Sequence, residues 1–549
     1  MRSRGADVDP RGFEPLTPCM QGRCSAGLSY GPRRRVAYGP SERTRRSSTG
    51  GGPLDGGAVA AGHPETLRAA LRALAAGGNA FDAAVAAGFS AAVAEPTLSS
   101  LAGGGFLLAV PAGEDPVLHD FFVDAPGLGA PARDEAGHGA RAAHGEPELV
   151  RFHGAEQVFH VGAASVAVPG CLAGYLHVHA RHGRLPLADL VRPAARLARE
   201  GVVLGPGQAA VVRLLEPIMT REPAGAARYA RGPDGRPFAD DRVVTDELLA
   251  AFLDDVADGR RTSFADPDLA PAIVADLAAK GGTITLTDLA AHRVIEREPL
   301  RVTLDGPHGP ATLLTNPAPS FGGPLVVDAL TALVALPPGV RGRCGDGARL
   351  VALADVLADL TARHRRSRGT THVSIVDAEG NLASMTTSNG SNSGVHLAGT
   401  GVMANNIMGE EDLHPGGAST TPPGTRVGSM MAPSVLERPG RPTVVLGSGG
   451  SERIRSAITQ VVAALVIDDL PLVDAVLTPR LHVAEDAVQL EPGIDPEALA
   501  ALRAAHPVNV WSATDLYFGG VHAVDTAGGH VGDPRRGGVS DRYRPQGTP

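Results

Sequence analysis

Hydrophobic positions recur at helical spacing early in the chain. In the segment 64–76 the apolar side chains fall three and four residues apart, and Gly77-Gly78-Asn79 then stops the predicted helix. A second helix is predicted from about residue 80 to a point before Pro96. The run LAGGGFLLAV (101–110) indicates a glycine-rich turn that leads into a buried strand. Two further amphipathic helices are predicted, at 184–200 and 348–364.

The spacing of hydrophobic positions changes after Gly369 from helical to alternating. THVSIVDAEGNLASMTTS (371–388) alternates on both sides of a turn at 377–381, which is typical of a β-hairpin. Three further strands are predicted, at 443–448, 488–492 and 522–526. Helices first, strands around 370 and mixed elements afterwards predict a layered α/β or α+β arrangement, and no repeat of fixed period is found.

Composition narrows the class of protein. Hydrophobic residues make up 43% of the 549 and aromatic residues only 4%, so the core must consist of small aliphatic side chains. The net charge of −9 argues against a nucleic-acid partner, which needs a basic face. No uninterrupted apolar run reaches the roughly 18 residues that span a bilayer, so no membrane association is predicted.

The first 54 residues differ from the rest. They are rich in Arg, Ser, Gly and Pro and lack the apolar stretch of a secretory signal. We expect 1–54 to be a disordered or non-native extension, with the ordered protein beginning near Gly56. Without a signal segment, the expected location is the cytoplasm.

The four cysteines show neither metal-ligand spacing nor a disulfide framework. Cys19 and Cys24 lie in the N-terminal extension. Cys171 and Cys344 are isolated, and we expect both to be inert core thiols.

Thr370 is a candidate nucleophile. It opens the predicted hairpin directly after a helix and the charged stretch RHRRSRG (363–369). If the preceding peptide bond is cut, the new α-amino group, with a pKa near about 7.7–8.0, is able to take the proton of the threonine hydroxyl. Backbone N–H groups in GSGGS (447–451) are candidate oxyanion donors. Taken alone this spacing is a weak signal, because any strand can begin with threonine.

A resemblance to a known family strengthens the case for Thr370 as the nucleophile. TTHVSIVDAEGN (370–381) closely resembles the start of the small subunit of gamma-glutamyltranspeptidases, which are N-terminal-nucleophile hydrolases. Similar blocks follow in the same order over nearly everything from 56 to the end: LAAGGNAFDAAVAAGFSAAVAEP (74–96), VAVPGCLAGY (166–175), NPAPSFGG (316–323), SMMAP (429–433), GSGGSERI (447–454) and GDPRRGG (532–538). A collinear match of this length is far more specific than a short motif.

The resemblance implies a proenzyme that cuts itself between Gly369 and Thr370. The large-subunit portion would be 55–369 and the small-subunit portion 370–549, together forming an α+β, four-layer αββα sandwich. Thr370 would then attack the amide of a small γ-glutamyl donor such as glutathione, and water, an amino acid or a peptide would accept the acyl group. The resemblance implies neither a metal nor an organic cofactor.

The resemblance also carries site residues to this chain. It assigns Thr370 as nucleophile and Ser388 as its supporting hydroxyl, and it assigns Gly450 and Ser451 as the oxyanion pair. The donor would be bound by Asn389, Glu410 and Ser429.

Some positions depart from the family pattern. Phe122, in DFFVDAP (120–126), stands where the family has an arginine that binds the donor's α-carboxylate, and a phenyl ring cannot replace that contact. Either another arginine, for which Arg426 and Arg453 are candidates, reaches the donor, or the donor is not a standard γ-glutamyl compound. Ile407 likewise replaces a glutamine.

Three hypotheses therefore stay open. The first is a self-processing γ-glutamyltransferase or hydrolase. The second is an amidase or acylase of the same fold with a different acyl donor. The third is an inactive, unprocessed homologue that acts as a binding protein.

Other patterns favour structural roles. Gly103–Gly105 lacks the Lys-Ser/Thr of a phosphate-binding loop, and His372 is expected to be a structural histidine.

Overall fold

The computed structural model describes residues 56–130, 145–151, 156–363, 370–410, 413–414, 421–484 and 487–545. The predicted N-terminal extension at 1–54 lies outside the described residues, as does the stretch 364–369 before the predicted cleavage point.

Two antiparallel sheets form the centre of this part of the chain. The first has seven strands in the order β20-β1-β11-β12-β2-β3-β8. Their bounds are Gly57–Ala61 (β1), Gly104–Val110 (β2), Val117–Phe121 (β3), Ile295–Arg297 (β8), Thr371–Val376 (β11), Leu382–Ser388 (β12) and Val539–Tyr543 (β20). The predicted hairpin at 371–388 is thus confirmed as the pair β11–β12.

The second sheet has six strands in the order β19-β18-β14-β13-β10-β9. Their bounds are Leu300–Gly306 (β9), Gly309–Thr315 (β10), Ser434–Glu437 (β13), Val444–Gly449 (β14), Gly520–Asp525 (β18) and His530–Val531 (β19). The two sheets pack face to face, with β11 and β12 against β14 and with β1 and β11 against β18.

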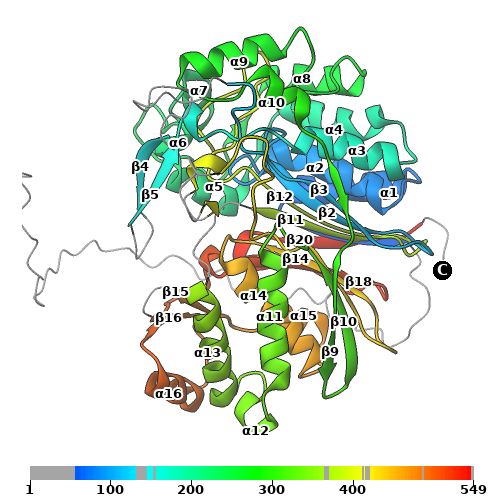
Figure 1. The fold of residues 1–549 in the computed structure, drawn as a ribbon, viewed down its shortest axis with the longest axis vertical. Coiled ribbons are helices and arrows are strands. Elements are labelled where there is room, and N and C mark those ends of the chain that lie inside the picture. Colours follow the sequence, from blue (N-terminus) through cyan, green and yellow to red (C-terminus); the bar gives the residue numbers. More distant parts are fainter. Residues whose placement is uncertain are drawn as a thin grey trace, which may run out of the picture. The chain divides into compact units, whose positions relative to one another are not determined.

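Helices cover the outer face of each sheet (Figure 1). The first sheet is covered by α1 (Pro64–Ala75), α2 (Ala80–Ala94) and α3 (Cys171–His182), and α4 (Leu187–Glu200) and α8 (Glu247–Ala257) pack behind them. The second sheet is covered by α11 (Gly322–Ala335) and α14 (Arg453–Val466), with α13 (Gly347–Arg363) and α16 (Pro496–Ala505) beyond. The predicted α+β, four-layer αββα sandwich is confirmed.

Small side chains allow the layers to approach closely. All fifteen residues of α2 are buried and most are alanine, and its first turn is fixed by a capping box between Asn79 and Asp82. Along β1 the side chains alternate, Val59 and Ala61 packing toward the helices and Ala58 and Ala60 between the sheets. The low aromatic content therefore matches the core that the sequence predicts.

Shorter elements complete the described part. The remaining strands are Glu146–Arg151 (β4), Glu156–Val161 (β5), Val202–Val203 (β6), Val243–Val244 (β7), Leu481–Ala484 (β15), Ala487–Leu490 (β16) and Val508–Val510 (β17). The remaining α-helices are Gly205–Leu214 (α5), Glu216–Met219 (α6), Pro223–Tyr229 (α7), Ala270–Ala279 (α9), Leu286–Ala291 (α10), Pro338–Arg341 (α12) and Leu472–Leu477 (α15).

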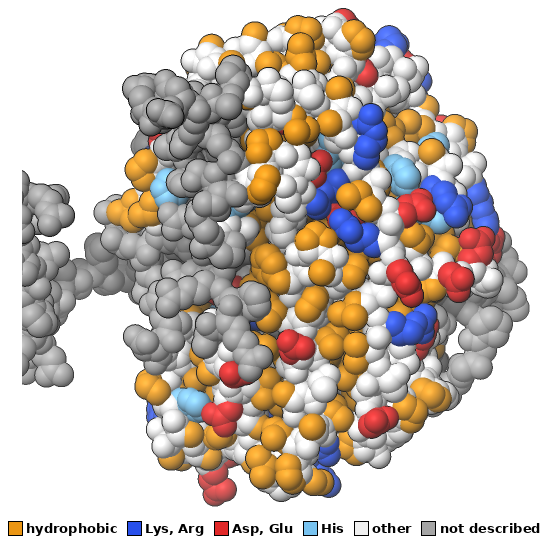
Figure 2. All heavy atoms as spheres, in the orientation of Figure 1, with side chains coloured by type: hydrophobic (Ala, Val, Ile, Leu, Met, Phe, Trp, Pro, Cys, Tyr) orange, Lys and Arg blue, Asp and Glu red, His pale blue; other side chains and the backbone are white. Residues whose placement is uncertain are grey.

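The described helices are all too short or too polar to cross a bilayer. On the coloured part of the face in Figure 2, basic and acidic side chains are interspersed, and no basic patch forms there.

Candidate active site around Thr370

Thr370 lies immediately before β11, near the centre of the first sheet, and it is only 3% exposed. The next residue, Thr371, points to the helix side, where its hydroxyl donates to Glu95 at the end of α2. Burial raises the pKa of Glu95, and the hydrogen bonds from Thr371 and Thr66 partly counteract this. Because side chains alternate along a strand, Thr370 faces the second sheet.

The sheet register brings Ser388 beside Thr370. Thr371 pairs with Thr387 across β11 and β12, so the next pair along places Ser388 opposite Thr370 on the same face. Ser388 in turn pairs with Gly104 of β2, and its Oγ accepts the N–H of Gly390 at 3.0 Å. The predicted supporting hydroxyl is therefore a direct neighbour of the predicted nucleophile.

Strand β14 of the second sheet runs directly against this point. A Cβ atom on Gly449 would clash with the Thr370 carbonyl oxygen, and one on Gly447 would clash with the ring of His372. Glycine at both positions is what allows the two sheets to approach here. The end of β14, which carries the predicted oxyanion pair, is thereby held against the start of β11.

The backbone turns sharply at the oxyanion pair. Gly450 has φ +125° and Ser451 has φ +68°, both outside the range of ordinary strand or helix. Neither N–H donates to an acceptor among the described residues, and the Ser451 Oγ is buried without a described partner. Two adjacent N–H groups beside Thr370 are the arrangement that stabilises a developing oxyanion.

Sequence reasoning missed Arg536. Its Nη1 donates to the Thr370 carbonyl oxygen at 3.4 Å, and its guanidinium lies beside Gly449 and Gly450. Burial, together with the nearby positive charge of Arg453, lowers the pKa of Arg536 to about 10, so this side chain still carries its charge at neutral pH. The only available signal was its place in the GDPRRGG block.

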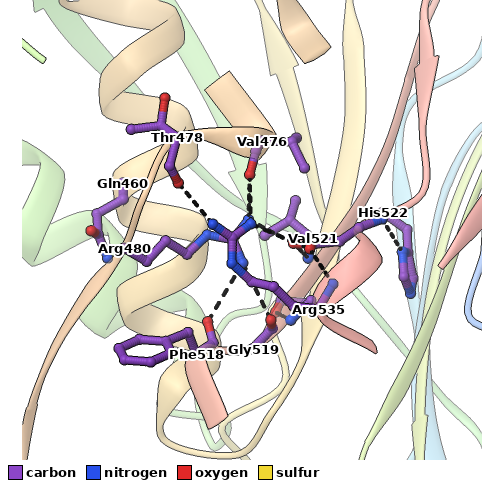
Figure 3. Close-up of polar contacts among 12 residues, drawn as sticks. Gln460, Val476, Thr478, Arg480, Phe518, Gly519, Val521, His522 and Arg535 are labelled. Carbon is purple, nitrogen blue, oxygen red and sulfur yellow. Dashed lines mark hydrogen bonds and ion pairs between the residues drawn. The ribbon is translucent and has the colours of Figure 1, made fainter. Parts of the chain in front are cut away.

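A buried ionic cluster holds the Arg536 turn in place, and Figure 3 shows its two arginines, Arg480 and Arg535, among their backbone carbonyl partners. Arg535 makes a bidentate pair with Glu491 at 2.7 and 2.6 Å, and Arg480 pairs with Asp533 at 2.7 Å. Asp533 also accepts the backbone N–H of Val521 on β18 at 2.9 Å. The cluster has two positive and two negative side chains, so the charge of Arg536 is not cancelled within it.

The three predicted donor-binding residues lie in two places. Asn389 and Glu410 flank the turn that follows β12: the Asn389 amide donates to the carbonyls of Met403 and Ala404, and the Glu410 carboxylate lies against Gly390. Ser429 lies in another loop. Its carbonyl accepts the N–H groups of Phe321 and Gly322, and its Oγ accepts that of Met431.

Phe122 forms an apolar wall near this face of the sheet. It is buried, stacks on Phe106 with centroids 5.6 Å apart and lies against Gly104. Thr370, Ser388 and Gly104 occupy three neighbouring strands, so the ring lies about 10 Å from the nucleophile.

The two arginines considered as substitutes are already engaged. Arg426 bonds the carboxylates of Asp120 and Asp124, each at 2.8 Å. Arg453 stacks on Tyr517 and contacts Glu452 at 3.2 Å. Because Asp120 and Asp124 neutralise its charge, Arg426 offers little attraction to a substrate carboxylate.

His372 and Cys171 have structural surroundings. The His372 Nδ1 bonds the Thr386 hydroxyl at 2.7 Å and its Nε2 bonds that of Ser374 at 2.9 Å, and burial holds its pKa well below the usual range. Burial raises the pKa of the Cys171 thiol to about 12, which removes the reactive thiolate at neutral pH.

The family model for gamma-glutamyltranspeptidase matches residues 67–340 and 351–546. This chain belongs to the gamma-glutamyltranspeptidase family. Among its relatives, the Acylase ACY 1 proenzyme of Pseudomonas sp. (strain SE83) is 32% identical over 489 residues, which cover 81% of this chain and 85% of that protein. The glutathione hydrolase proenzyme of Pseudomonas aeruginosa is 30% identical, covering 82% and 86%.

Solved structures show the same fold. Cephalosporin acylase from Bacillus halodurans superposes with a TM-score of 0.71 at 23% identity, covering 92% of this chain and 99% of that one. At this identity the likeness supports the architecture alone.

Proposed function

We propose that this member of the family is a self-processing amide hydrolase or acyltransferase whose nucleophile is Thr370, with γ-glutamyl amides such as glutathione as donors. The observation that carries the proposal is that Thr370 lies beside Ser388 and next to the end of β14, where the N–H groups of Gly450 and Ser451 have no acceptor among the described residues. These groups come from three strands and from both sheets, which brings a hydroxyl and an oxyanion site together in a buried setting.

Processing would use the same atoms as turnover. The Thr370 Oγ attacks the Gly369 carbonyl, the peptide nitrogen leaves as the new α-amino group, and water hydrolyses the resulting ester. In turnover, Oγ attacks the donor amide while the α-amino group takes its proton and passes it to the leaving amine. Water or an amino acceptor then releases the acyl group from Thr370.

Intact mass and N-terminal sequencing test the nucleophile. We expect a fragment of 180 residues (549 − 369) that begins Thr-Thr-His. Thr370→Ala is expected to abolish both processing and turnover, whereas Thr370→Ser retains a hydroxyl and is expected to process more slowly. A processed, active Thr370→Ala protein would contradict the proposal, and an uncut wild-type chain would favour the binding-protein hypothesis.

A second candidate, an acylase for a different acyl group, is favoured by Phe122 and by the pairing of Arg426. Both observations leave the donor's α-carboxylate without the arginine that the family resemblance implies. A relative named as an acylase supports the same alternative.

Four anilides separate the two candidates. The γ-glutamyl anilide carries an α-amino group and an α-carboxylate, the glutaryl anilide only the carboxylate, the 4-aminobutyryl anilide only the amine, and the butyryl anilide neither. A γ-glutamyl enzyme is expected to prefer the first by at least about tenfold in kcat/KM. Equal or faster turnover of the 4-aminobutyryl or butyryl compound would favour the acylase.

A further inference from the structure

Three histidines and a glutamate gather on the helix side of the first sheet. His119 comes from β3, Glu296 from the neighbouring edge strand β8, and His177 and His182 from α3. Ring centroids lie 5.3 Å apart for His119 and His177 and 5.0 Å apart for His119 and His182. The cluster thus joins a strand, an edge strand and the helix that covers them.

The ligand atoms of three of these side chains converge. One ring nitrogen of His119, one of His177 and a Glu296 carboxylate oxygen all lie within 4.8 Å of one another. The His177 Nε2 is 3.1 Å and the His119 Nδ1 is 3.8 Å from the same Glu296 Oε1. Ligand atoms around a tetrahedral zinc ion, with bonds of about 2.0–2.1 Å, are separated by about 3.3 Å. Small side-chain movements therefore complete the geometry.

The buried member of the set has an unused nitrogen. The His119 side chain is fully buried, and its Nδ1 has no hydrogen-bond partner among the described residues. Its other nitrogen, Nε2, lies 2.9 Å from the His182 Nε2. If Nε2 carries the proton and donates it to His182, Nδ1 presents a lone pair toward His177 and Glu296. A second residue that fixes the tautomer of a ligating histidine in this way is typical of metal sites.

We propose that His119, His177 and Glu296 form a zinc site, with His182 orienting His119 and water completing the coordination. Two imidazoles and one carboxylate suit Zn²⁺ better than Mg²⁺ or Ca²⁺, which prefer oxygen ligands alone. Glu296 and His177 are 42% and 35% exposed, so an ion reaches the site from solvent. Arg181 competes with the ion, since its Nε lies 3.9 Å from Glu296, but its side chain is 53% exposed and free to move outward.

The site is separate from the active site. His119 lies three strands from β11, about 14 Å away, and it faces the helices whereas Thr370 faces the second sheet. The ion therefore fastens β8 and α3 to β3 and takes no part in the acyl chemistry. The proposal is independent of the proposed function.

Zinc titration calorimetry of untagged, chelator-treated protein tests the site, and the visible absorption of bound Co²⁺ reports its coordination. We expect one tight equivalent in the wild type, at least about tenfold weaker binding in Glu296→Gln and His177→Gln, and tighter binding in Arg181→Gln. The matched controls are Glu298→Gln and His308→Gln, both exposed and outside the cluster, which are expected to bind as the wild type does.

Zinc should also raise the melting temperature of the wild type but not that of Glu296→Gln. Wild-type zinc affinity in both Glu296→Gln and His177→Gln, or no zinc binding by the wild type at micromolar concentration, would overturn the proposal. Glu296 and His177 are surface positions, so these variants are expected to fold.

Discussion

Arg536 places a positive charge beside the backbone of Thr370, and the charge is not cancelled by an ion pair with a described acidic residue. In the proposed mechanism the α-amino group of Thr370 must be unprotonated to accept the hydroxyl proton. A nearby cation disfavours the ammonium form and so lowers the pKa of that amine. Arg536 would thus act by tuning the base, without touching the donor.

Arg536→Gln is expected to raise the pKa that governs the acidic limb of kcat/KM by about one unit, because removing a cation stabilises the ammonium. Activity would fall at pH values below this pKa and recover at alkaline pH. Arg536→Lys keeps the charge and should keep the wild-type profile. An unchanged acidic limb in Arg536→Gln would show that the charge does not act on the amine.

At the scale of elements, the turn at Asp533–Arg536 depends on contacts distant in sequence. Arg535 reaches Glu491, 44 residues away, and Arg480 reaches Asp533. Removing one partner of a buried pair leaves an unpaired charge in a medium of low polarity, whereas exposed pairs contribute little.

Glu491→Gln is expected to destabilise the protein by about 3–5 kcal/mol, measured by urea unfolding, and to reduce turnover because the Arg536 turn shifts. The matched control is Glu379→Gln, which removes an exposed bidentate pair with Arg184 and should cost less than about 1 kcal/mol. Similar losses in the two variants would contradict the role given to burial.

The sequence predicted the helices and strands better than it predicted the charged contacts around the site. Strict alternation in 371–388 and helical spacing in 64–94 are local properties, and the helices and strands predicted there are confirmed. The position of Ser388 opposite Thr370 follows from the hairpin alone. By contrast, the engagement of Arg426 by Asp120 and Asp124, and the approach of Arg536 to Thr370, depend on residues about 160–300 positions away, which no local pattern encodes.

At the scale of the whole described body, the interface between the sheets is polar near the active site. The Ser374 hydroxyl donates to the His522 carbonyl, and that of Ser384 donates to Leu446 of β14. His522 is buried among His372, Asp533, Arg536 and Arg480. The pKa of His522 is lowered to about 4, chiefly by burial; Asp533 partly counteracts the burial, and Arg536 and Arg480 contribute to the lowering.

This buried histidine predicts acid sensitivity. The unfolded chain binds a proton at His522 near pH 6.5 and the folded chain only near pH 4, so stability falls as the pH drops through that window. The contribution amounts to about 2 kcal/mol between about pH 7.5 and pH 5. His522→Asn should show a smaller acid-induced loss than the wild type in thermal melts, while the exposed His308→Asn should match the wild type. Identical slopes in all three would contradict the prediction.

The order of strands has a consequence for assembly. In the first sheet β1 lies between β20 and β11, and in the second β10 pairs with β13, so segments from both sides of residue 370 contribute strands to each sheet. A cut before Thr370 would turn a folding reaction of one molecule into an association of two, neither of which has a complete sheet alone. The precursor would then unfold at a midpoint independent of its concentration, whereas the midpoint of the cut protein would rise with concentration. If the chain folds before the cut, the strands from its two portions are already paired. If the two portions were separated and then mixed, they would reach the same pairing only slowly.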